Sequence, residues 1–541
     1  MIRTAPPNVL LVHPRFNRNA FWNYHETCAV AGARYSAAPL GLITVAALLP
    51  PDWPTRLVDR NVEQLRGEDL DWADVVMIGC MMPQQQDAKR VIGLAHERSR
   101  PVVMGGPDVT SSPSVYAEVE FRILGEAEDI MADFIAAWRR GDTQGEFAAR
   151  EFPDLRTSPR PRFELLKLKH YMHVGVQFSR GCPHQCEFCN VIELNGRVPR
   201  FKSDAQMLHE LEVLHALGYR GHVDFVDDNL IGNAKAARSF LAALGTWSER
   251  HGHPFEYSTE ASLNLADNDE LLALMQRAGF FAVFVGIETP DEAALLGAGK
   301  LQNLRRDIAA SVRRIYRAGI YVNAGFILGF DAESDEVGRL MTGCIEDAAI
   351  PMCMVGLLYA LPGTALSHRL QAEGRLHADS DRLTGSDEAD QCTSGLNFDT
   401  VRPRAEILAD YRAILDRINA PAAFFGRVRR LNRELDLSRQ RTHRPLRRTG
   451  RDLRSFSRIV WRLGVRDREV RAQFWRTLAA SLLHNPRTLR GTMSFAALYL
   501  HVASFSRFID GRLSAQIGAL APPEAPSPAT RAQTRAATAQ A

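Results

Sequence analysis

The chain has 541 residues, a formal net charge of +3, and hydrophobic and charged fractions of 45% and 24%, as in ordinary globular proteins. A chain of this length divides into roughly two to four domains. The small net charge excludes a strong overall field that would attract nucleic acid. The apolar run from Val9 to Val12 is too short for a signal peptide, and no window of about 18 apolar residues predicts a transmembrane helix. We therefore expect a cytoplasmic protein.

Short apolar segments alternate with helical patterns, such as 87–98, in residues 1–145. Continuous apolar runs of this length are typical of parallel strands that are buried on both faces. We predict a doubly wound, Rossmann-like α/β domain, in which ligands bind beyond the C-terminal ends of the strands. Residues 146–170, which contain several prolines, are predicted to be a linker. The expected strands read NVLLVHP, TRLVDRN, DVVMIGCMM, PVVMGGP and FRILGEAE.

A second series of strands and helices occupies residues 171–400. Repeated strand–helix units imply a parallel sheet with right-handed crossovers, and six units predict a partial (β/α)6 barrel of the TIM type. Ser203 and Gln206 form a capping-box pattern at the first helix, and Gly218 ends it. Later helices are expected near 233–250, 267–278, 303–318 and 335–347. The six expected strands read HVGVQFS, VDFVDD, FEYSTEA, FFAVFVGIE, YVNAGFILGF and MCMVGLLYA.

The remaining sequence has no strand pattern. Residues 401–520 are predicted to form a helical extension. Residues 521–541 are a low-complexity segment, which we expect to be disordered.

Three of the eight cysteines lie within eight residues, directly after the first expected barrel strand. Cys182, Cys186 and Cys189 could bind three irons of a [4Fe–4S] cluster and leave the fourth iron open. An open iron can chelate the amino and carboxylate groups of S-adenosylmethionine (SAM) and pass one electron to it. The alternative is zinc with His184 as a fourth ligand, but zinc sites usually pair CxxC with a second, distant pair. The other five cysteines are scattered.

The spacing CxxxCxΦC after the first strand of such a barrel resembles the radical SAM superfamily. The resemblance implies contacts to SAM at the strand ends: Phe188 against the adenine, Asp227 and Asp228 near the amino group, and residues of the third to fifth strands elsewhere. Taken alone, each of these could be an ordinary polar strand end. The further expected SAM-binding residues are Glu260, Glu288, Gly325 and Ile327.

A doubly wound domain ahead of such a barrel resembles the cobalamin-binding class of this superfamily. Small residues after its strands would let a corrin approach the backbone. The chain lacks the Asp-x-His-x-x-Gly motif whose histidine binds cobalt in mutases, so we expect cobalamin to bind without a protein histidine. The expected contacts are Gln84, Gly105, Gly106, Pro107, Gly125 and Glu126.

The combination of the three regions is similar to the hopanoid C-2 methylase group, through FVDDNLIGN (225–233), GIETP and LPGT (361–364). The resemblance implies a cobalamin-dependent C-methyltransferase acting on an unactivated carbon of an apolar lipid or natural product, with an electron donor such as flavodoxin or ferredoxin. A cobalamin radical cyclase or rearrangement enzyme would use the same parts without methyl transfer. A non-catalytic iron–sulfur redox sensor would form no 5′-deoxyadenosine.

Residues 441–476 contain twelve arginines and only three acidic residues. Arg454, Arg458, Arg462 and Arg466 recur every four residues, which predicts an amphipathic cationic helix. Three interpretations remain open: a solvated face packed on the barrel, peripheral membrane contact through 441–510, and nucleic-acid binding. Few aromatic residues lie between the arginines, so we expect no nucleic acid. The apolar run 493–505 is too short to cross a bilayer.

Overall fold

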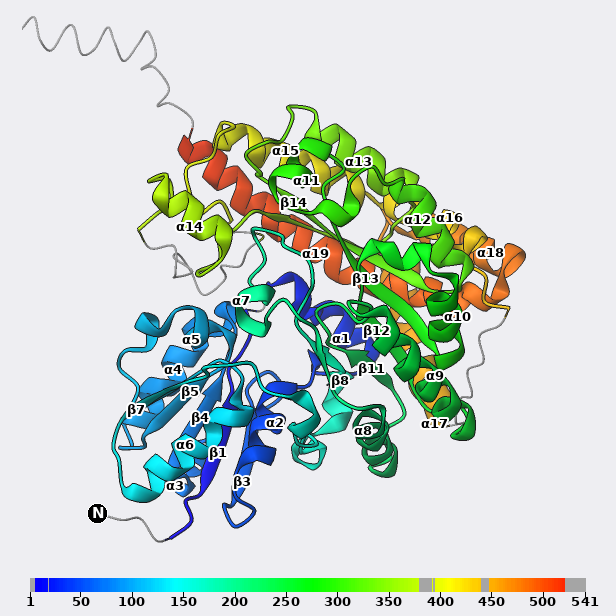
Figure 1. Ribbon diagram of the computed structural model, residues 1–541. Coiled ribbons are helices and arrows are strands. Elements are labelled where there is room, and N and C mark those ends of the chain that lie inside the picture. Colours follow the sequence, from blue (N-terminus) through cyan, green and yellow to red (C-terminus); the bar gives the residue numbers. More distant parts are fainter. Residues whose placement is uncertain (1–4, 18, 379–391, 393–394, 439–446, 521–541) are drawn as a thin grey trace, which may run out of the picture.

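The first unit is a parallel six-stranded sheet in a computed structural model that describes residues 5–17, 19–378, 392, 395–438 and 447–520 (Figure 1). All five strands expected from the sequence are present, and β7 is added at one edge. In sheet order the strands are β3 (Thr55–Asp59), β1 (Val9–His13), β4 (Val75–Gly79), β5 (Val102–Gly105), β6 (Phe121–Leu124) and β7 (Gly145–Ala148).

Helices cover both faces of this sheet, because successive strand residues point to opposite sides. Leu10 and Val12 pack into one core with α4, whereas Val9 and Leu11 pack into the other with α2 and α6. This is the doubly wound arrangement predicted from the apolar runs. The helices are α2 (Leu40–Leu48), α3 (Gly67–Trp72), α4 (Gln85–His96), α5 (Pro107–Ser111) and α6 (Ala127–Arg140).

The second unit is a curled, parallel sheet of seven strands, which forms part of a barrel. Its six predicted strands occur in the predicted order. In sheet order the strands are β15 (Cys353–Leu357), β14 (Tyr321–Leu328), β13 (Phe280–Glu288), β12 (Glu256–Glu260), β11 (His222–Phe225), β8 (Tyr171–Val176) and β2 (Tyr35–Ala37).

The seventh strand, β2, comes from the N-terminal part of the chain and was not predicted. The chain leaves the first sheet after β1, forms a 3-10 turn (Phe21–Asn23) and α1 (His25–Ala31), and pairs with β8 before it returns to β3. Because these residues complete the barrel edge, the two α/β units share chain segments as well as a surface. Residues 146–170, predicted as a linker, begin inside β7 and continue through three short 3-10 turns.

The helices between the barrel strands lie close to their predicted positions. Ser203 caps α8 by accepting a hydrogen bond from the Gln206 amide at 3.2 Å, which confirms the capping box. The helices are α7 (Val191–Asn195), α8 (Asp204–Ala216), α9 (Ala234–Arg250), α10 (Asp269–Ala278), α11 (Glu292–Gly297), α12 (Ile308–Arg317), α13 (Val337–Asp347) and α14 (Ala365–Ala372).

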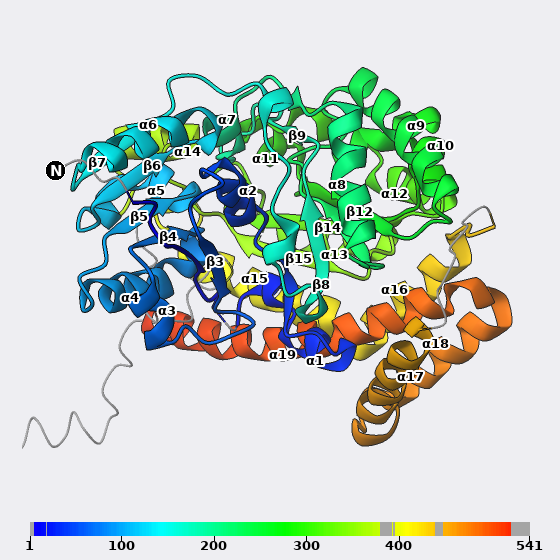
Figure 2. The ribbon, with the colours of Figure 1, turned by 90° about the horizontal axis from the view of Figure 1, so that it is seen from below.

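The C-terminal extension is helical, as predicted, and Figure 2 shows α19 running beside α1 and α15, with α17 and α18 at one end of the molecule. The hydroxyl of Thr27 donates to the carbonyl of Ala497 at 3.0 Å, which ties α19 to the N-terminal segment. Among the described residues, no helix has the length and apolar character needed to cross a bilayer. The elements are α15 (Arg404–Asn419), α16 (Pro421–Glu434), α17 (Arg447–Ile459), a π-helix (Val460–Arg466), α18 (Arg471–His484) and α19 (Leu489–Leu520). The segment 521–541, expected to be disordered, lies outside the described residues.

Candidate active site

The three clustered cysteines lie on the loop that follows β8 and the short strand β9 (Ser179–Arg180). Cys186 is buried, and Cys182 and Cys189 are half-buried. Burial raises the pKa of all three thiols, that of Cys189 to about 12, while Lys300 acts in the opposite direction. Soft thiolates are the donors that iron–sulfur clusters prefer. In the described part of the chain, no group of three or more His, Cys, Asp or Glu side chains is arranged to hold a single metal ion.

Two adjacent aspartates at the end of β11 hold the start of the cysteine loop. Asp227 is buried, and its carboxylate accepts hydrogen bonds from the backbone N–H of Phe178, at 3.1 Å, and of Ser179. Asp228 accepts from the N–H of Gly181 at 2.9 Å. Gly181 has φ +97°, and a Cβ there would lie 2.9 Å from two carbonyl oxygens. Both aspartates thus hold the start of the cysteine loop through its backbone N–H groups. Asp228 also lines a cavity.

The loop between α11 and α12 supports the cysteines from the other side. The N–H of Glu187 donates to the carbonyl of Ala298 at 3.0 Å. The side-chain amide of Gln302 lies 3.8 Å from Cys186 Sγ. A Cβ at Gly299 would lie 2.7 Å from the carbonyl oxygen of Gln185, so the two loops touch at backbone distance. No sequence pattern predicted these supporting residues.

The other residues expected to bind SAM gather at the C-terminal ends of β12 to β14. Glu288 has a positive φ of 66° and forms an ion pair with Lys300 at 2.7 Å. Lys300 also lies near the cysteines and was missed by the sequence analysis. The Glu260 side chain is exposed to the cavity, and its enclosed position in the protein interior, reinforced by neighbouring carboxylates, raises its pKa to about 8.

Three further residues expected to bind SAM flank this group. The Phe188 ring packs edge-on against Phe330, with ring centroids 5.6 Å apart. In β14, Ile327 is half-buried and Gly325 is buried; a Cβ at Gly325 would lie 3.0 Å from the Phe284 ring. The structure therefore brings the expected group together at one barrel end, with Asp227 turned toward the backbone.

The C-terminal edge of the first sheet faces the same region. Gly106 has φ +98°, and a Cβ there would lie 2.9 Å from the Cys80 carbonyl oxygen. Gly105, Pro107 and Gly125 line the cavity beside it. Because the glycines at this edge carry no side chain, a flat ligand can approach the backbone closely here.

Gln84 and a histidine that the sequence analysis did not single out lie at the same edge. The amide of Gln84 donates to the Pro14 carbonyl at 2.6 Å, and its nitrogen lies 3.3 Å from His13 Nε2. His13 ends β1 and lines the cavity. The expectation that no protein histidine binds cobalt stays a prediction. His13 is the histidine at this edge whose replacement would test it.

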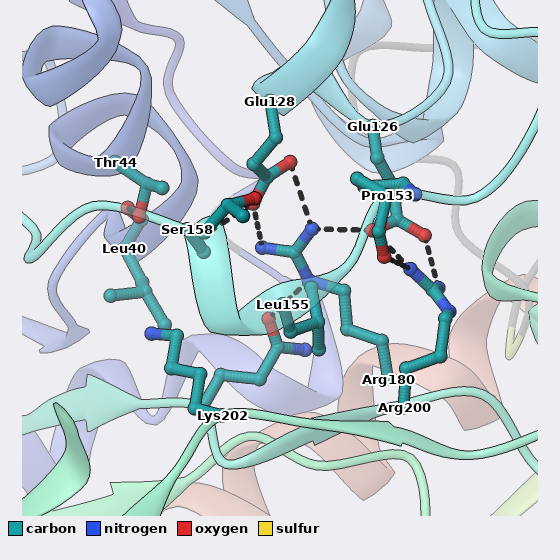
Figure 3. Close-up of polar contacts among 12 residues, drawn as sticks. Leu40, Thr44, Glu126, Glu128, Pro153, Leu155, Ser158, Arg180, Arg200 and Lys202 are labelled. Atoms are coloured by element: carbon teal, nitrogen blue, oxygen red, sulfur yellow. Dashed lines mark hydrogen bonds and ion pairs between the residues drawn. The ribbon is translucent and has the colours of Figure 1, made fainter. Parts of the chain in front are cut away.

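Glu126 differs from the other residues of this edge, because its carboxylate forms ion pairs with two arginines of the barrel unit. It pairs with Arg180 at 2.6 Å and with Arg200, and Arg180 also pairs with Glu128 at 2.9 Å (Figure 3). The glutamates begin α6, and the arginines lie on β9 and the short strand β10 (Arg200–Phe201). These ion pairs join the first sheet to β9, the two-residue strand that ends shortly before Cys182.

A cavity of about 2290 Å³ joins the edge of the first sheet to Asp228 and Glu260 at the barrel end. It extends from the glycine edge of the first sheet, past Asp228 and Glu260, through the barrel interior to α19. Most of its lining side chains are apolar, including Trp22, Phe284 and Phe495. Cavities that bind small molecules are typically lined in this way, with a few polar groups to fix orientation.

Comparisons with known proteins agree with this geometry. The Radical SAM superfamily model matches residues 176–341, and a domain of unknown function, DUF4070, matches residues 364–515. An uncharacterized methyltransferase of Synechocystis sp. is 40% identical over 510 residues, which are 94% of this chain and 94% of that protein. The hopanoid C-2 methylase of Rhodopseudomonas palustris is 34% identical over 476 residues, which are 86% of this chain and 88% of that protein. The chain belongs to this radical SAM family.

The protein is accordingly a radical SAM enzyme of a methyltransferase family, with a [4Fe–4S] cluster and SAM as cofactors. Membership selects the iron–sulfur interpretation of the cysteines over zinc. Two solved structures share the fold: OxsB with aqua-cobalamin bound (TM-score 0.58, 15% identity, 95% of this chain and 81% of that one); and TsrM of Kitasatospora setae with cobalamin and a [4Fe–4S] cluster bound (TM-score 0.57, 14% identity, 91% and 98%).

Proposed function

We propose that this enzyme is a cobalamin-dependent radical SAM C-methyltransferase that acts on an unactivated carbon of an apolar, hopanoid-like lipid. The supporting observation is one cavity, which joins the glycine edge of the first sheet to Asp228 and Glu260 at the barrel end. Two cofactors and a substrate need such a shared space, because the atoms that react must approach within about 3–3.5 Å of one another.

The residues at both ends fit the proposed groups. Cys182, Cys186 and Cys189 would hold the cluster, and the flat edge at Gly105 and Gly106 would take a corrin. When bound, the cluster supplies the electron that cleaves SAM to a 5′-deoxyadenosyl radical, and the corrin supplies the methyl group. An external reductant such as flavodoxin or ferredoxin would deliver the electron.

The chain itself would position these groups and exclude water. Glu260 and Asp228 face the cavity from neighbouring strands, where their carboxylates can orient the ammonium group of SAM. Arg180, tied to Glu126 and Glu128, holds the first sheet against the cysteine loop. Trp22 and Phe284, with ring centroids 5.3 Å apart, close the space with apolar surface.

Product analysis of the anaerobically reconstituted enzyme tests this function. With a hopanoid substrate we expect S-adenosylhomocysteine and 5′-deoxyadenosine in equal amounts, together with a product heavier by one CH₂ group. The cyclase or rearrangement alternative predicts 5′-deoxyadenosine without S-adenosylhomocysteine. A redox sensor predicts neither compound.

We also infer that one end of the helical extension contacts a membrane surface at the cytoplasmic face. Several large apolar side chains of α17, the π-helix and α18 are exposed, among them Trp461 and Leu483, while Arg454, Arg466 and Arg468 are exposed beside them. Leu453 and Phe456 are exposed and also line the cavity, so a lipid could pass from the bilayer to the barrel.

The contacts differ in part from those expected of an amphipathic helix lying on lipid. Ile459, Leu463 and Phe474 are buried against the protein, and Arg462 pairs with Glu26 of α1 at 2.6 Å. The inner face of the extension is therefore structural. We propose membrane contact through its outer face alone. The exposed apolar side chains of this face are Leu453, Phe456, Trp461, Val465, Trp475, Leu482 and Leu483.

A further inference from the structure

The interior of the barrel contains a band of polar side chains below the proposed SAM site. Alternate residues of each strand point inward, so His222 and Asp224 of β11 line the cavity, as do Ser258 of β12 and Asn323 of β14. Closed eight-stranded barrels are normally filled by layers of bulky apolar side chains, whereas this partial barrel encloses a cavity. The polar band can therefore contact a molecule that binds in the cavity.

Hydrogen bonds organise three members of this band. Ser258 Oγ donates to the Asp224 carboxylate, and it lies 2.5 Å from His222 Nε2. Because the single hydroxyl proton of Ser258 is directed to Asp224, His222 is the donor in the second contact. The His173 ring packs beside His222, with centroids 5.1 Å apart. The array is thus rigid and presents carboxylate oxygens to the cavity.

Asn323, which the sheet register aligns with Phe284 and Glu260, lines the same cavity with an acceptor that has no partner. Within the described part of the chain, its Oδ1 atom is buried and makes no hydrogen bond. A buried polar atom that is left unpaired destabilises the protein, so such atoms in cavities usually have a ligand or water as partner. Asn323 therefore calls for a donor from the molecule that fills the cavity, and Asp224, which already accepts from Ser258, can accept a second hydrogen bond.

The surroundings determine what kind of molecule can supply that donor. The band lies between apolar walls that include Trp22, Phe281 and Phe495. Ser258 is two residues below Glu260 on the same strand, a separation of about 7 Å along it. A ligand that spans this region must be mainly apolar, with a hydrogen-bond donor set back from the end that reacts.

We propose that Asn323, Asp224, Ser258 and His222 form a binding site for a hydroxyl group of the substrate. On the proposed function, the substrate is then a hydroxylated hopanoid-like lipid and not a pure hydrocarbon. The hydroxyl lies inside the barrel, while the carbon to be methylated lies toward Glu260 and Asp228. The four residues act in substrate selection and positioning.

The test compares binding of diplopterol, a hopane alcohol, with binding of diploptene, the matching hydrocarbon. Equilibrium binding to the full-length, cluster-loaded enzyme is measured with both lipids in the same detergent. We expect the alcohol to bind about tenfold or more tightly than the hydrocarbon, the range expected for pairing a buried polar group. Asn323→Leu and Ser258→Ala should reduce this ratio toward one by weakening alcohol binding only.

Ser248→Ala is the matched control, because Ser248 is a buried serine of α9 that contacts Tyr257 at 3.3 Å, on the outer side of the sheet. It should keep the wild-type ratio. Circular dichroism and iron content verify that each variant is folded, and the wild-type ratio alone already tests the site. Equal binding of the two lipids, absence of binding of either, or an unchanged ratio in both folded variants would overturn the proposal. Methyl transfer is scored separately, by S-adenosylhomocysteine formation, so either proposal can fail alone.

Discussion

The guanidinium of Arg180 lies 2.6 Å from the carboxylate of Glu126, and both side chains are largely buried, at 14% and 7% exposure. Arg180 stands two residues before Cys182, whereas Glu126 directly precedes α6 at the edge of the first sheet. The pair thus connects the proposed corrin side of the cavity to the proposed cluster loop by one direct ion pair.

Replacing Arg180 by Gln should destabilise the protein and uncouple the two units. Removing one partner of a buried ion pair costs about 3–5 kcal/mol, and we expect the lower end of this range because Glu126 keeps its ion pair with Arg200. Denaturant unfolding measures this loss. Arg156→Gln is the control: its pair with Asp154 is exposed, so a change under about 1 kcal/mol is expected. Similar losses in both variants would show that Arg180 has no special role.

Each of Cys182, Cys186 and Cys189 should be needed for the cluster. Loss of one thiolate leaves one iron without its protein ligand, so each Cys→Ala variant should lose most bound iron and sulfide after anaerobic reconstitution. Cys353→Ala is the control, because that thiol is buried in β15 and hydrogen-bonds the Ile350 carbonyl at 3.5 Å. Full iron content in the Cys186→Ala variant would refute the assignment.

Replacing Gly106 by Val should block cobalamin binding. Gly106 has φ +98°, and a Cβ added there would lie 2.9 Å from the Cys80 carbonyl oxygen. Backbone strain of about 1–3 kcal/mol adds to this overlap with Cys80, so the loop that forms the edge must shift out of the geometry proposed to bind the corrin. Hydroxocobalamin binding is followed by absorbance, and the unfolding midpoint is measured in parallel. Gly93→Ala in α4, where nothing lies within 4 Å of the added methyl group, should retain binding. Wild-type cobalamin binding by the Gly106→Val variant would remove the corrin site from this edge.

The sequence predicted both sheets because their strands are continuous apolar runs with turn residues between them. It also located the cysteine loop, since the three thiols and their spacing are local. β2 could not be predicted, because Tyr35–Ala37 is too short to carry a strand pattern and pairs with a strand more than a hundred residues away. The ion pair of Glu288 with Lys300 could not be predicted either, and nor could the polar band inside the barrel. Both depend on which side chains a curled sheet brings together.

Glu260 should make the stability of the protein fall as the pH rises. Its position inside the barrel cavity, where the side chain is exposed to the cavity itself, raises its pKa from 4.5 to about 8, and Asp224 and Asp228 add to this shift. Between these two values the folded state binds more protons than the unfolded state, so the contribution of Glu260 is complete below pH 4.5 and is lost as the pH approaches 8. Melting temperatures are measured from pH 5 to pH 8 without SAM.

Glu260→Gln cannot ionise and should therefore flatten this dependence relative to the wild type. Glu292→Gln is the matched control, because Glu292 lies in the first turn of α11 on the protein surface. If the wild type and the Glu260→Gln variant lose stability in parallel over this range, another group is responsible.

The outer face of α17 to α18 should bind anionic membranes. Attraction of basic side chains to such a surface is worth on the order of 1 kcal/mol per residue, and salt screens it. Trp461 and Leu483 would add apolar contact at the headgroup boundary, where tryptophan is favoured. We expect the full chain to co-sediment with vesicles rich in anionic lipid at low salt, weakly with neutral vesicles, and less at high salt.

The apolar part of this interaction can be separated from the electrostatic part by single substitutions. Trp461→Ser should weaken sedimentation with anionic vesicles while leaving the fold intact, because the side chain is 62% exposed. Leu296→Ser, at a residue of α11 that is 63% exposed and lies outside the proposed contact face, should have no effect. If the full chain stays in the supernatant at low salt, the exposed apolar side chains do not face a bilayer. The lipid substrate would then have to reach the cavity from solution or from a carrier.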